Sequence, residues 1–109
     1  MISDDIREEL INGLREILSE KLDSIILYGS FARGDATSES DVDIALIINT
    51  SLNDDMRNAF LHWNALMDLK YEKVFSIVDI EREQIDKWGS VLPFYKNVKN
   101  EGIVLWKAA

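Results

Sequence analysis

The chain has 109 residues, of which 47% are hydrophobic, and its 20 acidic against 12 basic side chains give a formal net charge of −8. This length and apolar fraction indicate one folded domain and exclude a disordered chain, and no apolar run approaches the roughly 20 residues needed to cross a bilayer. The negative charge disfavours a protein that holds long nucleic acids, while the absence of cysteine excludes disulfides and favours a cytoplasmic location.

The first half of the sequence predicts a helix, a strand, a polar connection and a second strand. The helix is expected over residues 3–21, because Ser3 can cap it and apolar residues then recur at helical spacing. Residues 25–28 form a continuous apolar run, which is typical of a strand covered on both faces. After a turn and a short helix over residues 30–33, we expect the second strand over residues 41–48.

The second half predicts one long helix, a strand, two short helices and a last strand. The long helix is expected over residues 52–69, with Ser51 and Asp54 as a capping box. The remaining elements are expected as a strand over residues 73–80, helices over 81–88 and 93–99, and a strand over 103–106. This alternation predicts an α/β fold in which helices pack against one small mixed sheet.

Two aspartates at the start of the second strand form a candidate metal site. Asp41 and Asp43 are two residues apart, so both side chains leave the same face of the strand. Neighbouring carboxylates repel each other, and a hard cation such as Mg²⁺ relieves that repulsion. A bound Mg²⁺ ion would polarise a phosphoryl group and lower the pKa of an attacking hydroxyl. The alternative is an acidic turn whose carboxylates are simply solvated.

The turn after the first strand is a candidate phosphate-binding segment. Gly29 lets a ligand approach the backbone, and Ser30 adds a hydroxyl at the start of a short helix. Arg33 either binds phosphate or forms a structural ion pair with Asp35 or Asp41. An ordinary strand-ending turn and helix cap remain the alternative for the first two residues. The segment matches neither the P-loop pattern nor the Rossmann glycine pattern.

These residues together resemble the signature of the polymerase-β-like nucleotidyltransferases. The segments that carry the resemblance are Gly29-Ser30, Ala32-Arg33-Gly34 and Ser40-Asp41-x-Asp43. The length and the Ala-Arg-Gly element look most like the minimal nucleotidyltransferases (MNT). The resemblance implies an α+β nucleotidyltransferase core, with residues 1–109 as a single nucleotidyltransferase domain. It also implies transfer of a nucleoside monophosphate, expected to be AMP from ATP, with release of pyrophosphate.

The resemblance assigns roles to particular residues. Gly29 and Ser30 would hold the triphosphate, with Arg33 as a further nucleotide-binding residue. Asp41 and Asp43 would bind two Mg²⁺ ions. The family also uses a third carboxylate from the next strand, and we expect this residue to be Asp79, which shares one face of that strand with Phe75 and Ile77. Asp68, near the end of the preceding helix, is the alternative. Without a third carboxylate, the base that activates the acceptor hydroxyl would be missing.

The resemblance also suggests a partner. The resemblance to the MNT branch implies an antitoxin of a HEPN/MNT toxin–antitoxin pair, with AMP attached to a tyrosine of the HEPN toxin. We therefore expect a HEPN-type partner encoded next to this chain, and neither long nucleic acid nor a membrane. The alternatives are a small-molecule acceptor, such as an aminoglycoside, and a non-catalytic module that neutralises its partner by binding.

Overall fold

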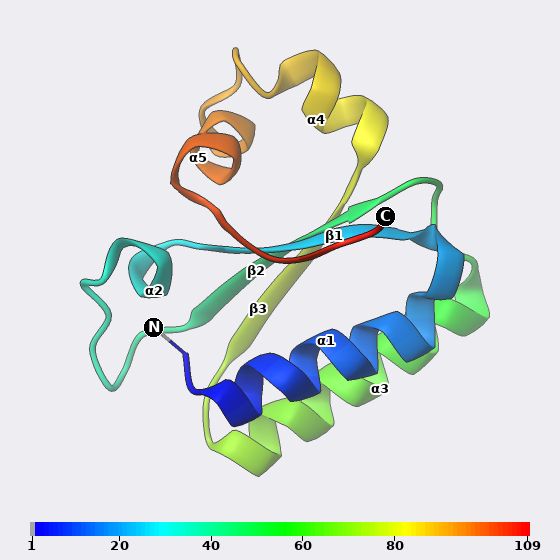
Figure 1. Cartoon of the computed structure of the whole chain (residues 1–109). Coiled ribbons are helices and arrows are strands. Elements are labelled where there is room, and N and C mark those ends of the chain that lie inside the picture. The colour runs from blue at the N-terminus through cyan, green and yellow to red at the C-terminus, as the bar shows by residue number, and fades with distance from the viewer. Residues whose placement is uncertain (1) are drawn as a thin grey trace.

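The computed structural model describes residues 2–109, and its helices and strands follow the predicted order (Figure 1). A short 3₁₀ turn over Ser19–Lys21 joins the first helix to the first strand. The elements are α1 (Asp4–Leu18), β1 (Leu22–Tyr28), α2 (Ser30–Arg33), β2 (Val42–Ile48), α3 (Asp54–Tyr71), β3 (Phe75–Glu81), α4 (Arg82–Trp88), α5 (Pro93–Glu101) and β4 (Ile103–Lys107).

Polar side chains determine where the two long helices begin. Ser3 caps α1 as predicted, because its hydroxyl accepts a hydrogen bond from the backbone N–H of Ile6 at 3.3 Å. The capping box expected from Ser51 and Asp54 is wrong, since the cap of α3 is Asn53. Its side-chain oxygen accepts from a backbone N–H three residues later at 2.8 Å, so α3 begins at Asp54, two residues later than expected.

The four strands form one mixed sheet in the order β3-β2-β1-β4. β1 lies antiparallel to both β2 and β4, and β3 lies parallel to β2. Two pairings set the geometry at one end of the sheet, because Asp43 lies opposite Tyr28 on β1 and opposite Ser76 on β3. β1 and β2 are therefore interior strands, which explains their continuous apolar sequence.

Helices cover both faces of the sheet, with α1 and α3 on one face and α4 and α5 on the other (Figure 1). Val42, Ile44 and Leu46 of β2 pack into the core beneath α1 and α3. Ala45 and Ile47 point to the other face and pack into the smaller core beneath α4 and α5. No helix within residues 2–109 is long and apolar enough to span a bilayer.

Candidate active site

The turn that follows β1 brings the backbone against the carboxylate of Asp43. Gly29 has φ 74°, which is in the left-handed half of φ space where glycine is favoured. A Cβ atom at this position would collide with the Asp43 carboxylate, so space as well as backbone conformation requires glycine. The Gly29 carbonyl accepts hydrogen bonds from the N–H groups of Ala32 and Arg33 at 3.1 and 3.0 Å and closes the turn into α2.

The same turn leaves two backbone donors free for a ligand. Within residues 2–109, the N–H groups of Ser30 and Phe31 have no hydrogen-bond acceptor. The side chain of Phe31 is buried in the core and anchors the turn, while Ser30 is half-buried at the start of α2. The geometry is therefore compatible with the phosphate contact predicted for Gly29 and Ser30.

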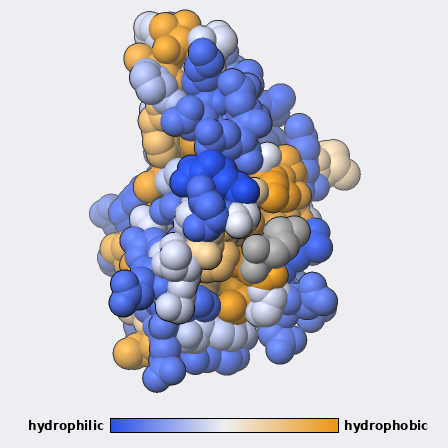
Figure 2. All heavy atoms as spheres, turned by 90° about the vertical axis from the view of Figure 1, so that its left-hand side faces the viewer, coloured by the Kyte–Doolittle hydropathy of each residue, from blue (hydrophilic) through white to orange (hydrophobic). Residues whose placement is uncertain are grey.

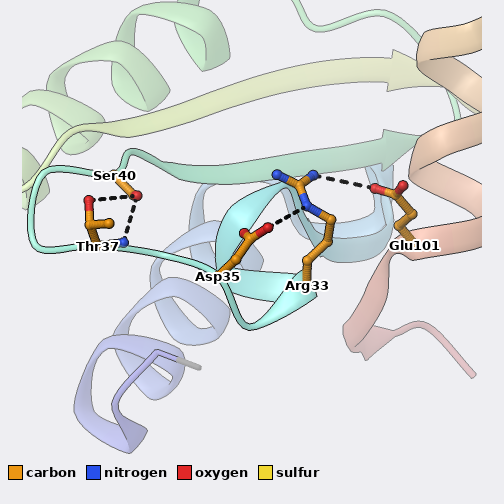
Figure 3. A network of polar contacts seen from close by, with 5 residues as sticks. All are labelled: Arg33, Asp35, Thr37, Ser40 and Glu101. Carbon is orange, nitrogen blue, oxygen red and sulfur yellow. Dashed lines mark hydrogen bonds and ion pairs between the residues drawn. The ribbon is translucent and has the colours of Figure 1, made fainter.

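A hydrogen-bonded turn delivers Asp41 and Asp43 to the same end of the sheet. The hydroxyl of Ser40 accepts from the N–H of Thr37 at 2.9 Å, and the N–H of Ser40 donates to the Thr37 carbonyl at 3.1 Å (Figure 3). Asp41 follows directly. The β2 ladder then begins with a 2.9 Å hydrogen bond from the N–H of Val42 to the carbonyl of Val74. Asp43, one residue further, is held in the sheet between Tyr28 and Ser76.

Asp43 lies in an environment that disfavours its negative charge. Partial burial raises the pKa of its carboxyl group, the neighbouring charge of Asp41 raises it further, and Arg33 acts in the opposite direction. Such a pair gains from a bound cation, so its chemistry fits one divalent ion. Within residues 2–109, no group of three or more His, Cys, Asp or Glu side chains is arranged to hold a metal. Among the described residues, Asp41 and Asp43 are thus not joined by a third acidic side chain.

Arg33 is engaged by carboxylates of the protein itself. Its guanidinium donates to Asp35 at 3.3 Å and pairs with Glu101 at 3.5 Å (Figure 3). The hydrogen bond to Asp35 is also the main cause of its raised pKa. Of the two alternatives for this residue, the structure shows the ion pair with Asp35. The pair with Glu101 additionally connects α2 to the end of α5.

Asp79 does not join the aspartate pair. It lies opposite Leu46 of β2, three positions further along the strands than Asp43, and on the face covered by α1 and α3. There its carboxylate accepts two hydrogen bonds from Arg57 of α3 at 2.9 and 3.3 Å. Asp79 does share one face of β3 with Phe75 and Ile77, as predicted. However, Asp43 lies on the opposite face of the sheet.

Ser76 occupies the position on β3 where a third carboxylate would be expected. It is the residue directly opposite Asp43, and it lies on the same face of β3 as Val78 and Ile80, which pack beneath α4 and α5. The expected side-chain set for two Mg²⁺ ions is therefore incomplete. Apolar residues occur on both faces of β2 and β3, so the sequence did not indicate that Ser76 would lie opposite Asp43; the register of β3 against β2 determines it.

The alternative residue, Asp68, has a structural role. Its carboxylate accepts from the N–H of Phe75 at 2.8 Å and from the amide of Asn64 at 3.4 Å, so it fixes the start of β3 against the end of α3. It lines a small hollow that also contains Asp41. These contacts explain why an acidic residue follows the apolar stripe of α3 at this point.

Comparisons with known proteins found a family model and relatives that match most of the chain. The family model described as Polymerase beta, Nucleotidyltransferase matches residues 12–108. Two proteins of Methanocaldococcus jannaschii named as protein adenylyltransferases are each 33% identical. MJ0604 aligns over 99 residues, which cover 91% of this chain and 93% of that protein. MJ0141 aligns over 72 residues, which cover 66% of this chain and 73% of that protein.

Solved structures share the fold at lower identity. A toxin–antitoxin crystal structure with AMP-PNP contains a chain that superposes with a TM-score of 0.66, at 22% identity, over 94% of this chain and 73% of that one. A complex of a tri-AMPylated HEPN toxin of Shewanella oneidensis with its MNT antitoxin gives 0.63, at 19% identity, over 98% of this chain and 74% of that one. The small mixed sheet flanked by helices is thus the polymerase-β-like nucleotidyltransferase fold.

Proposed function

The chain belongs to the Polymerase beta nucleotidyltransferase family, and from this premise we propose that it transfers AMP from ATP to a hydroxyl group of a protein, with release of pyrophosphate. The observation that carries the proposal is the contact between the Gly29 turn and the Asp43 carboxylate, with Asp41 beside it. A nucleoside triphosphate needs such a combination, because its anionic chain requires both backbone donors and a carboxylate-bound cation.

Each part of the site has a defined task in this proposal. The N–H groups that follow Gly29, together with the hydroxyl of Ser30, bind the triphosphate. Asp41 and Asp43 would hold an Mg²⁺ ion, which neutralises charge on the phosphates and makes the α-phosphorus more electrophilic. Gly29 allows the turn to approach the Asp43 carboxylate this closely, because a Cβ atom on residue 29 would collide with it.

A protein acceptor is supported by the names of the relatives. Both 33% identical relatives are named as protein adenylyltransferases, and one structural neighbour is an MNT antitoxin in complex with an AMPylated HEPN toxin. We propose that the acceptor of this chain is likewise a HEPN-type protein encoded next to it. The net charge of −8 favours a basic protein partner over a nucleic acid, because like charges repel the phosphate backbone.

The test is an intact-mass measurement on the partner. The chain is incubated with ATP, Mg²⁺ and the purified protein of the neighbouring gene. A gain of one or more AMP units on the partner is expected, and Asp43→Asn should abolish it. Asp79→Asn is the matched control, because it removes the same charge from the other face of the sheet and should leave the transfer intact. Equal transfer by the Asp43→Asn protein would refute the proposed site.

Ser76 favours a second candidate function, in which the domain binds its partner without modifying it. A site with two carboxylates retains the means to hold a nucleotide, but within residues 2–109 it lacks a third carboxylate, on β3 opposite Asp43, that could accept the proton of an attacking hydroxyl. In that case the partner would be neutralised to the same extent by the wild-type chain and by a chain with both Asp41→Asn and Asp43→Asn. No change in partner mass would accompany the neutralisation.

A further inference from the structure

An exposed aromatic side chain lies beside the candidate active site without a role in the chemistry described above. Phe94, in the first turn of α5, is 43% exposed although it is a large apolar residue. Its ring packs edge-on against Tyr28, with 5.7 Å between the ring centroids, and lies 5.6 Å from the ring of Tyr95. One face of a well-anchored aromatic cluster is therefore open to a ligand.

The chain of contacts leads from this cluster directly to the aspartate pair. Tyr28 is the last residue of β1, immediately before Gly29, and it lies opposite Asp43 in the sheet. The Asp43 charge is close enough to contribute to the raised pKa of the Tyr28 phenol, although burial is the larger cause. Phe94 is thus separated from the turn and from the carboxylates by a single aromatic ring.

A second contact fixes this arrangement from the other end of α5. Glu101, the last residue of the helix, pairs with Arg33 of α2 at 3.5 Å (Figure 3). The helix is therefore attached to the candidate phosphate segment at its end and to the end of β1 at its beginning. Figure 2 shows further apolar side chains at the upper tip of this side of the molecule, where α4 and α5 are connected. Its exposed apolar residues include Val91 and Leu92.

We propose that Phe94, supported by Tyr28, is the platform on which the base of the bound nucleoside triphosphate stacks. This inference rests on the proposed function, since it names where the rest of the nucleotide lies once its phosphates meet the Gly29 turn. A flat apolar ring accepts any base through its π-face, and the stacking energy grows with the area covered. The platform therefore selects purines over pyrimidines, and it discriminates only weakly between adenine and guanine.

The experiment compares nucleotides with a ligand that has no base. Binding of ATP, CTP and inorganic tripolyphosphate, each with Mg²⁺, is measured by calorimetry for the wild-type chain and for three variants. Removal of a stacking ring weakens binding of a base by about 5- to 150-fold. Phe94→Ala should weaken ATP binding by this factor and leave tripolyphosphate binding unchanged. Phe94→Tyr should retain ATP binding, and Val91→Ala, an exposed apolar control from the same segment, should behave as wild type.

The possible outcomes separate the inference from the proposed function. If the wild-type chain binds ATP and Phe94→Ala binds it equally well, the platform is wrong and the proposed function stands. If Phe94→Ala loses tripolyphosphate as well, the ring supports the turn rather than the base, and the platform is again wrong. A wild-type chain that binds neither ATP nor tripolyphosphate refutes both the platform and the proposed function. If Phe94→Ala binds ATP as wild type does but no longer binds the partner protein, the exposed ring belongs to an interface and the platform is wrong.

Discussion

The replacement Ser76→Asp tests whether β3 really presents this position to Asp43. Opposite residues of neighbouring strands are only about 5 Å apart, so the new carboxylate would join the two existing ones. Two unit charges at roughly 5 Å repel by about 1 kcal/mol in water and about 3 kcal/mol at an effective dielectric constant near 20. Because Asp43 is partly buried, we expect a metal-free destabilisation between these limits.

The assay is thermal unfolding with and without Mg²⁺, followed by the adenylylation measurement. For a chain of about this size, each 1 kcal/mol lowers Tm by about 4 °C or more. The loss should be recovered on addition of Mg²⁺, since a third carboxylate completes a metal site. If a missing proton acceptor limits transfer, the rate should rise by about 10²-fold or more.

Ser76→Asn is the matched control for this experiment, because it introduces a side chain of the same shape without the charge. It should show neither the Mg²⁺-dependent recovery nor the gain in rate. A Ser76→Asp protein whose Tm is the same as wild type in metal-free buffer, and does not respond to Mg²⁺, would refute the placement of this residue beside Asp43.

Three further changes test other parts of the structure. Gly29→Ala should lower the free energy of unfolding by about 1 to 3 kcal/mol, because alanine is strained at this φ. Calorimetry should also show that this variant does not bind ATP. Retained ATP binding would contradict the close approach of the turn to Asp43. Asp79→Asn should cost about 1 kcal/mol or less in chemical denaturation, because its partner Arg57 is 43% exposed, and a larger loss would contradict this estimate. The hydrogen bond from Lys70 holds the pKa of Glu9 below its ordinary value. This contact therefore stabilises the fold fully at a pH above the pKa that Glu9 has in the unfolded chain. The stabilisation is lost as the pH falls through the lowered pKa of Glu9 in the folded chain. Lys70→Met should therefore lower Tm near pH 7 and lower it less near pH 3, and an equal loss at both would exclude this linkage.

The order and type of the elements could be predicted from the sequence because local signals agreed with the final packing. The continuous apolar run that ends at Tyr28 and the polar stretch before Asp41 indicate two interior strands joined by a turn, as the structure shows. The predicted start of α3 was wrong because two residues that can each cap a helix, Ser51 and Asn53, lie within three residues of sequence. The carbonyl of Ser51 instead accepts a hydrogen bond from Lys21 at 3.0 Å, and local sequence does not contain this contact between residues far apart in the chain.

The site was predictable where its residues are close together in the sequence. The segment from Gly29 to Asp43 is local and carries the family resemblance, and the antiparallel pairing of β1 with β2 brings its turn and its aspartates to one end of the sheet. The contribution of β3 was not predicted, because its register against β2 is a long-range property. Asp79 was expected because it shares a face with Phe75 and Ile77, whereas the position opposite Asp43 is held by Ser76. The role proposed for Phe94 depends on how α5 packs over β1. The spacing of apolar residues within α5 does not indicate this packing.

The pairing of β1 with β2 has a consequence for how such proteins diversify. The candidate phosphate turn and both aspartates lie in one antiparallel strand pair and its connection, so the groups of the candidate site are contained in about a seventh of the chain. Phe94 and Ser76 come from elements that follow much later in the sequence and touch this unit from outside. Substitutions in α5 or β3 can therefore change the surroundings of this unit while its turn and both aspartates stay in place.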